Sequence, residues 1–422
     1  MTTSHLDRVR DFFGLRRGIV GLLAMVILVG LGEKMAERFL PVYLIALGGG
    51  VLSVGLLNGL DNLLSALYSL PGGYLSDRYG TKRALLLFNL LAMAGFLVVI
   101  LIPAWPAVIG ASFLFLSWTA ISLPASMSLV AQAVPATKRT MGVSMHSLVR
   151  RVPMALGPVI GGLFIDQWGE TTGVRLAFIA ALVLAGVAIL LQQALIPADA
   201  PAASGSPAAP HHPLRVLRAM HPDLRNLLVS DILIRFCEQI PYAFVVIWCL
   251  KTIADPVGAL EFGLLTTVEM VTAMLVYIPV AYLADHSAKK PYVLMTFVFF
   301  TLFPLALLLC QSFWPLVAAF VLRGLKEFGE APRKALIMDL APEDQKALTF
   351  GVYYLVRDSI VALAAFAGGL LWMHSPEANF LTAFGCGAVG TLWFALRGGR
   401  ARITRDTRAP RAAESGPASH SS

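Results

Sequence analysis

The chain has 422 residues, of which 57% are hydrophobic and 14% charged, and its formal net charge is +8. Soluble domains carry about 25% charged residues, so this chain has too few to cover the surface of a soluble protein. A basic balance can indicate nucleic-acid binding, but we find no soluble basic domain and expect no such partner. The composition instead predicts an all-α protein embedded in membrane lipid.

Apolar stretches of about 20 residues are long enough to span a bilayer, and twelve of them follow one another along the chain. The first half contributes 18–46, 52–72, 83–102, 106–134, 139–165 and 173–195. The second half contributes 226–250, 260–284, 291–310, 313–341, 347–372 and 378–396. We therefore predict twelve transmembrane helices in two six-helix bundles, 18–196 and 226–396.

The segments between and beyond the bundles are basic or rich in small residues. Residues 1–17 hold four arginines, and no small-residue cleavage site follows a short apolar core, so we expect no cleaved signal peptide. Residues 197–225 are rich in Pro, Ala, Gly and Ser, as in flexible linkers, and residues 397–422 form a tail that we expect to be disordered. Basic residues gather on the side of these three segments, which predicts cytoplasmic termini in a bacterial inner membrane.

The two halves resemble each other at an offset of about 208 residues. Pro71–Arg78 reads PGGYLSDR, and Pro279–His286 reads PVAYLADH. Further pairs at this offset are Asp61 with Glu269, Arg150 with Arg357, and Gly161-Gly162 with Gly368-Gly369. Two parallel six-helix repeats joined by a linker are a recognised transporter architecture. The repeat therefore predicts a carrier of small solutes.

The segment between the second and third spans reads GYLSDRYGTKR over Gly73–Arg83. It resembles the loop 2–3 signature of the major facilitator superfamily, G-x-L-x-D-R-x-G-x-K/R-K/R, at every defined position. The resemblance implies a twelve-helix transporter in which this segment latches the halves together in the outward-facing state. The alternative is that its basic residues only set the topology. The expected latch residues are Gly73, Asp77, Arg78, Gly80, Lys82 and Arg83.

A second motif lies in the fifth span, where Gly157–Gly162 reads GPVIGG. It resembles the core of the antiporter motif of drug:proton exchangers, although Pro153 replaces the usual small residue before it. Proline removes a backbone hydrogen bond and glycine removes the side chain, so a kinked and closely packed hinge is expected. Ordinary small-residue packing is the alternative. The expected hinge residues are Gly157, Pro158, Gly161 and Gly162.

Charged residues inside the spans are unevenly distributed. A charge at the bilayer centre costs at least ~2.5–3.5 kcal/mol, so it should face a cavity or a partner. Spans 3, 6, 9 and 12 carry none beyond their ends, as expected of outer, lipid-facing helices in the resembled fold. The candidate substrate and proton pathway comprises Glu33, Glu37, Arg38, Asp61, Arg150, Arg235, Glu238, Glu269, Arg323, Glu327 and Arg357.

The sequence leaves two roles open for these charges: static ion pairs, or groups that meet protons and substrate. Asp61 and Glu269 have no base within a turn of their own helix, which favours them as proton carriers over Glu37. Arg150 and Arg357 occupy equivalent repeat positions. They could clamp an anionic group between them, or neutralise Asp61 and Glu269 across the bundle.

The predicted function is secondary active transport of small organic solutes by alternating access, carried out by a monomer. No phosphate-binding loop is present, so proton coupling is expected in place of ATP, with sodium as the alternative ion. We expect no cofactor, no metal site and no enzymatic activity, because neither a nucleophile–base pair nor metal-ligand spacing occurs. Export of drug-like molecules or metabolites is favoured. The alternatives are proton-coupled uptake of a small organic anion, and a membrane receptor that does not transport.

Overall fold

The computed structural model describes most of the chain, and every regular element among the described residues is a helix. The predicted N-terminal segment, the linker and the tail lie largely outside that part, as does most of the span predicted at 106–134. The described residues are 17–116, 118, 122, 126, 149–196, 217–218, 220–285, 287–342 and 346–398. The predicted all-α membrane fold is confirmed.

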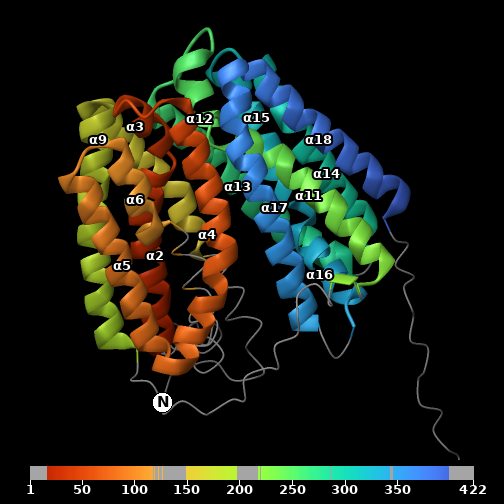
Figure 1. Cartoon of the computed structure of the whole chain (residues 1–422), viewed down its shortest axis with the longest axis horizontal. Coiled ribbons are helices and arrows are strands. Elements are labelled where there is room, and N and C mark those ends of the chain that lie inside the picture. The colour runs from red at the N-terminus through yellow and green to blue at the C-terminus, as the bar shows by residue number, and fades with distance from the viewer. Residues whose placement is uncertain are drawn as a thin grey trace, which may run out of the picture.

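The helices of the first half, here called the N-half, form one bundle (Figure 1). They are α2 (Arg17–Glu37), α3 (Leu40–Ala46), α4 (Gly50–Tyr79), α5 (Thr81–Leu101), α6 (Trp105–Phe115) and α9 (Arg151–Leu195). Helix α9 covers the sixth predicted span and the described part of the fifth from Arg151 onward. The chain turns at Gly169, whose positive φ of 78° favours glycine, so α9 consists of two helical segments. The first predicted span is also not one helix, since it divides into α2 and α3.

The helices of the second half, the C-half, form the other bundle. They are α11 (Pro222–Tyr242), α12 (Val245–Ile247), the π-helix η2 (Trp248–Thr252), α13 (Ala259–Asp285), α14 (Lys290–Leu309), α15 (Phe313–Gly324), the 3₁₀-helix η3 (Leu325–Gly329), α16 (Glu330–Leu340), α17 (Lys346–His374) and α18 (Pro376–Arg397). The tenth predicted span is therefore three short helices in series. A run of 3₁₀-helix within a longer helix often marks a functional hinge.

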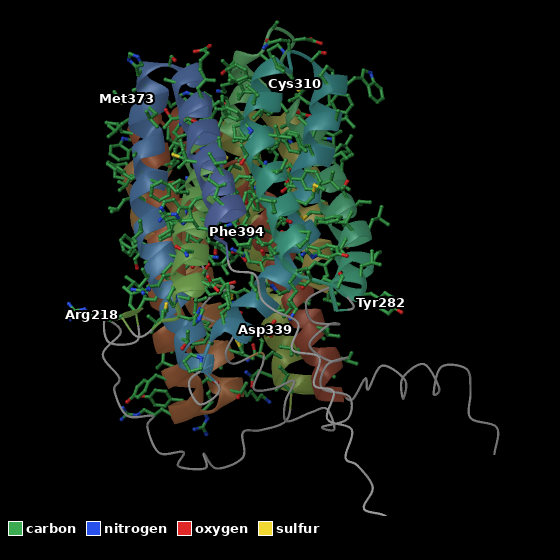
Figure 2. All side chains as sticks on the ribbon, turned by 90° about the vertical axis from the view of Figure 1, so that its right-hand side faces the viewer. Arg218, Tyr282, Cys310, Asp339, Met373 and Phe394 are labelled. Atoms are coloured by element: carbon green, nitrogen blue, oxygen red, sulfur yellow. The ribbon has the colours of Figure 1, made fainter. Side chains whose placement is uncertain are left out.

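Seven helices of the described part are long and apolar enough to cross a membrane, and α11 with the bent segment Val245–Thr252 adds an eighth. Their outward faces carry exposed apolar side chains, such as Leu190 on α9, Leu309 on α14 and Leu396 on α18. Figure 2 labels Cys310 and Met373 near one end of the bundle, with Asp339 and Tyr282 toward the other. Apolar side chains on the outside are expected where the solvent is lipid.

The two halves are joined at the end of the molecule that carries α3 and α12, and they spread apart toward the opposite end (Figure 1). Contacts between them run along α4 with α17 and along α9 with α13. A Cβ on Gly55 of α4 would lie 2.9 Å from the Cα of Gly369 on α17, so the two backbones touch directly. We call this end, formed by residues 50–59, 158–170, 258–263 and 362–369, the closed end.

Candidate functional site

A cavity lies between the halves, beside the closed end, and we call it the central cavity. Its polar lining comes from both halves, and apolar residues fill the rest of its wall. The lining residues are Glu37, Arg38, Leu40, Pro41, Leu57, Asn58, Asp61, Leu116, Tyr242, Ala243, Val245, Val246, Phe262 and Arg323. Four of the predicted pathway residues therefore share one space.

Two helix breaks at equivalent repeat positions open onto this cavity. Between α2 and α3, the N–H of Phe39 bonds the carbonyl of Ala36 at 3.0 Å. Between α11 and α12, the N–H of Phe244 bonds the carbonyl of Pro241 at 2.8 Å. Each is a tight i→i−3 bond next to a proline, Pro41 or Pro241, which cannot donate a helical hydrogen bond. Discontinuous helices of this kind line the substrate sites of many transporters.

Arg38 lies at the first of these breaks and is half-buried. Its guanidinium carbon lies 5.2 Å from the centre of the Tyr242 ring, which places a cation from one half over an aromatic ring of the other. Within the described part of the chain Arg38 makes no ion pair, because its neighbour Glu37 pairs with Lys34 instead. A half-buried guanidinium without a carboxylate partner can bind an anionic group of a ligand.

A second cavity lies inside the N-half. Glu33 and Arg150 line it, together with Trp118, Ser122 and Ser126. The side chain of Glu33 is 5% exposed, and its Oε1 lies 3.6 Å from the Nζ of Lys34. Its Oε2 has no hydrogen-bond partner among the described residues. Glu33 is therefore the most weakly satisfied buried acid of the N-half that the structure describes.

In the C-half the acids are paired across helices. Glu238 of α11 contacts both Arg235 and Lys326. Glu269 of α13 is fully buried, with Arg323 at 3.3 Å and Lys326 at 3.2 Å. The sequence argument, which rested on the lack of a base within one turn of Glu269, missed these partners because they lie on α15 and η3.

Arg357 likewise has a partner that spacing along one helix did not indicate. It lies 3.3 Å from Asp231 of α11, and Arg333 of α16 contacts the same carboxylate. The hydroxyl of Tyr353 donates to Asp231 at 3.0 Å. In this structure Arg357 therefore contacts Asp231, whereas Arg323 and Lys326 contact Glu269.

Polar contacts also cross between the halves. Arg151 of α9 pairs with Glu327 of η3 at 2.9 Å. The side-chain amide of Asn58 donates to the backbone carbonyl of Gln239 at 2.8 Å, and Asn62 donates to the side chain of Gln239 at 3.2 Å. Sequence reasoning missed both asparagines. Their spacing of four residues within an apolar helix was the available signal, because it puts two amides on one face.

The expected latch residues lie at the spread end, where the described ones contact their own half. Lys82 donates to the carbonyl of Gln193, in the last turn of α9, and to that of Ile196, which follows the helix. Arg78 donates to the hydroxyl of Tyr74 at 2.8 Å. Gly80, with a φ of 90°, separates α4 from α5, and Arg83 follows Lys82 in the first turn of α5. The side chain of Asp77, and the surroundings of Gly73, lie outside the described part.

The expected hinge residues pack α9 against helices of both halves. A Cβ on Gly157 would lie 2.7 Å from the Cβ of Lys34, and one on Gly161 would lie 1.9 Å from the carbonyl oxygen of Met35. On the other side, a Cβ on Gly162 would lie 2.4 Å from the carbonyl oxygen of Ala259 in the C-half. The motif therefore joins α2, α9 and α13 by backbone contact, with Pro158 inside α9.

The chain is similar to several known membrane transporters. An MFS-type transporter of Methanocaldococcus jannaschii is 23% identical over 366 residues, which cover 83% of this chain and 87% of that protein. The crystal structure of a POT family transporter in complex with 5-aminolevulinic acid aligns with a TM-score of 0.75 at 15% identity, covering 91% of this chain and 96% of that one. A nucleoside transporter aligns with a TM-score of 0.76 at 12% identity, covering 90% and 100%.

The sequence profile of the Major Facilitator Superfamily matches the chain twice, at residues 22–254 and 232–419. The two matches together cover both bundles and the central cavity between them. The resemblance carried by the segment Gly73–Arg83 is thereby confirmed. The chain belongs to the Major Facilitator Superfamily and is a membrane transporter of that family.

Proposed function

We propose that this transporter exports small organic molecules in exchange for protons, by alternating access. The observation that carries the proposal is the central cavity, which lies at the contact between the halves and is lined by Arg38 and Asp61 of one half and Arg323 of the other. A solute bound there touches both halves, so rocking of the halves would change the side from which it is reached.

Coupling to protons needs acids whose charge changes during the cycle. Asp61 lines the central cavity, and Glu33 lies in the neighbouring cavity with one carboxylate oxygen that lacks a hydrogen bond among the described residues. Burial disfavours the charged form of a carboxyl group, so such positions are suited to take up and release protons. Glu238 and Glu269 are paired with two bases each, and we assign them a static role.

The direction of transport is inferred from α9. Its Gly157–Gly162 segment is similar to the antiporter motif, and it brings the backbone of α9 against α2 in one half and α13 in the other. These contacts support a role for the Gly157–Gly162 segment as the pivot about which the two halves rock. We further propose that Gly73–Arg83 forms a latch when the spread ends of the two halves close. The transporter acts as a monomer, and both of its termini lie in the cytoplasm of a bacterial cell. Its chain is divided into the five segments 1–17, 18–196, 197–225, 226–396 and 397–422.

A second candidate function is proton-coupled uptake of a small organic anion. The observation that favours it is Arg38, a half-buried guanidinium that has no ion pair within the described residues and faces the central cavity. A carboxylate of a substrate would supply the missing partner. The third reading, a receptor that does not transport, predicts ligand binding without any proton movement.

One experiment separates these functions. Proteoliposomes with an imposed proton gradient and an internal pH-sensitive dye are challenged with lipophilic cations and with small organic anions. Export by exchange is supported if cations collapse the gradient in wild type and not in Asp61→Asn. Asp339→Asn is the matched control, because Asp339 is an exposed acid that pairs with Lys289 at the spread end.

The proposal is abandoned for symport if only anions move protons, in the same direction as themselves. If the protein binds a probe from either panel but moves no protons with it, the receptor reading replaces transport coupling. Sodium in place of the proton gradient serves as a further arm, which tests the alternative coupling ion.

A further inference from the structure

A buried ion cluster fills the C-half where α11, α16 and α17 meet, and we call it the C-half cluster. Its acids and bases contact one another, and they are Asp231, Glu330, Arg333, Lys334, Arg357 and Asp358. Asp231 is fully buried and contacts both Arg333 and Arg357. Arg357 also contacts Asp358 at 2.7 Å. Every base of the cluster therefore touches a carboxylate.

The second cavity, inside the N-half, lies at the place of this cluster in the first repeat. The register that pairs Glu37 with Glu238 relates α2 to α11. The register that pairs Pro124 with Pro332 relates the fourth span to the tenth. Four positions of the C-half cluster then correspond to residues that line the cavity. These pairs, with the C-half residue first, are Asp231 and Gly30, Glu330 and Ser122, Lys334 and Ser126, and Arg357 and Arg150.

The N-half has the arginine of this arrangement without its carboxylates. Arg357 contacts two carboxylates of the C-half cluster. At the positions of those two carboxylates the N-half has Gly30 and Arg151. Arg150, which is half-buried at the start of α9, makes no ion pair and no hydrogen bond with any residue that the structure describes. Its guanidinium therefore faces the cavity as a cation without a contacting acid.

The cavity itself is small and polar. Ser122 and Ser126 are buried and shorter than the charged side chains at the equivalent C-half positions, so they leave room for about one water molecule. A buried water makes about three hydrogen bonds to polar groups. The wall offers serine hydroxyls, the guanidinium of Arg150 and the carboxylate of Glu33. The space is thus suited to a bound water and is too small for an organic solute.

Glu33 supplies the carboxylate that lines this cavity. It lies three residues after Gly30 on α2, so both residues are on the same face of the helix. Its buried Oε2 has no hydrogen-bond partner among the described residues, and Lys34, 3.6 Å from its Oε1, also contacts Glu37. The charged groups around Glu33 come from α2, α4 and the start of α9, and they are Lys34, Glu37, Asp61 and Arg150.

We infer that Glu33 is a proton-binding group of the N-half and that Arg150 controls its charge across the cavity, through a water molecule bound between them. A hydrated proton gives its proton to Oε2 of Glu33, so the carboxylate becomes a neutral acid and one water molecule remains. Release reverses this step. The positive charge of Arg150 favours the carboxylate form. The inference rests on the proposed coupling to protons, and it names the base that controls one of the acids.

The test follows the protonation of Glu33 in the purified full-length protein, by infrared difference spectroscopy during a pH titration. A protonated carboxyl group gives a C=O stretching band that a carboxylate lacks, and Glu33→Gln should remove the band of this residue. A nearby opposite charge shifts the titration of a carboxyl group by about one to three pH units. Arg150→Gln should therefore raise the midpoint of the Glu33 band by about that much, and Arg150→Lys should leave it close to wild type.

Arg175→Gln is the matched control for the loss of charge. Arg175 is a second arginine of the N-half, and it donates to the backbone carbonyl of Ile100 instead of lining the cavity. Its substitution should leave the midpoint of the Glu33 band unchanged.

A second variant tests the same inference without removing Arg150. Gly30→Asp places on α2 the carboxylate that Arg357 contacts in the C-half, so it should neutralise Arg150 and also raise the midpoint of the Glu33 band. Adding Glu33→Gln identifies that band in the variant. Gly30→Asn is the matched control, because it adds the same Cβ, 3.1 Å from the Cγ of Pro153, and a side chain of the same size without charge.

An unchanged midpoint in Arg150→Gln, or equal midpoints in Gly30→Asp and Gly30→Asn, overturns the role of Arg150. The absence of any band that Glu33→Gln removes overturns the role of Glu33. The proteoliposome assay separates these results from failure of the proposed function. If cations still collapse the gradient in Glu33→Gln but not in Asp61→Asn, proton exchange stands and this inference is wrong. If Glu33 titrates as expected but no probe moves protons, the site stands and the coupling proposal fails.

Discussion

The carboxylate of Asp166, on α9 of the N-half, accepts a hydrogen bond from the backbone N–H of Ala259, the first residue of α13 in the C-half, at 2.9 Å. Its second oxygen accepts from the N–H of Leu260, also at 2.9 Å. One half therefore caps a helix of the other. The first N–H groups of a helix lack partners within the helix, and the helix dipole favours a negative charge beside them.

Asp166→Ala should shift the transporter toward a state in which the closed end is open. Loss of a helix cap costs about 0.5–2 kcal/mol, and only the closed state can make this cap. The population ratio should therefore change by about twofold to thirtyfold. Spin labels at Trp168 and Glu261, both exposed at this end, would report the change as a longer distance distribution.

The control for that experiment is Glu170→Gln. Glu170 of the N-half pairs with Lys251 of the C-half at 2.9 Å, also at the closed end, but both side chains are about one-third exposed. Exposed ion pairs contribute about 0–1 kcal/mol, so this variant should leave the distances close to those of wild type. A larger effect of Glu170→Gln than of Asp166→Ala would contradict the role given to the cap.

Gly55→Ala should also open the closed end, by a steric mechanism. The added Cβ would lie 2.9 Å from the Cα of Gly369 and 3.0 Å from the carbonyl oxygen of Phe366, and neither backbone atom can rotate away. Overpacking of this kind costs about 1–3 kcal/mol. Thermal unfolding of the purified protein, together with the spin-label distances, would measure it.

Gly186→Ala is the matched helical control, because nothing lies within 4 Å of a Cβ at that position of α9. Alanine is favoured over glycine in a helix by about 1 kcal/mol, so this variant should be as stable as wild type or more stable. The close-packing argument fails if the two substitutions lower the unfolding temperature equally.

Glu269→Gln should destabilise the C-half strongly. The substitution leaves the buried Arg323 beside the positively charged Lys326, without the carboxylate that both contact, and removal of one partner of a buried pair costs about 3–5 kcal/mol. Adding Arg323→Met removes that stranded charge, so the double variant should unfold at a higher temperature than Glu269→Gln alone. Strictly additive losses would show that the two side chains act independently.

The pair between Arg151 and Glu327 joins the halves on the cavity side of the closed end, at 2.9 Å. Arg151→Glu should lower the transport rate and widen the separation between α9 and η3, because two carboxylates would then face each other. Adding Glu327→Arg should restore both quantities. If the reversed pair restores neither, Arg151 acts through its contact with the Tyr277 ring instead.

Features that repeat along one helix could be predicted from the sequence, because apolar runs and charged faces depend on spacing within a single segment. The helical architecture, the family and the gathering of Arg38, Asp61 and Arg323 around one space follow from such patterns. The partners of Glu269 and Arg357 could not be predicted, since a helix with a charge every three or four residues leaves the partner helix undetermined.

The helix breaks were missed for a similar reason. Pro41 and Pro241 were visible in the sequence, but a proline in an apolar run is compatible with a kinked helix as well as with two helices. The 3₁₀ segment Leu325–Gly329 has no such marker. Its shape depends on the close approach of Gly329 to α14, which is a property of the packed bundle.

The contact between Gly55 and Gly369 has a consequence for how this transporter can diverge. Where the halves meet there, two main chains touch and no side chain takes part, whereas the groups that would recognise a solute are side chains deeper in the protein. If the central cavity holds the solute, as proposed above, changes of solute preference can accumulate through substitutions around Arg38, Tyr242 and Arg323 without altering this contact between the halves. Descendants of one ancestral gene could in this way acquire different cargoes while keeping the same mechanical cycle.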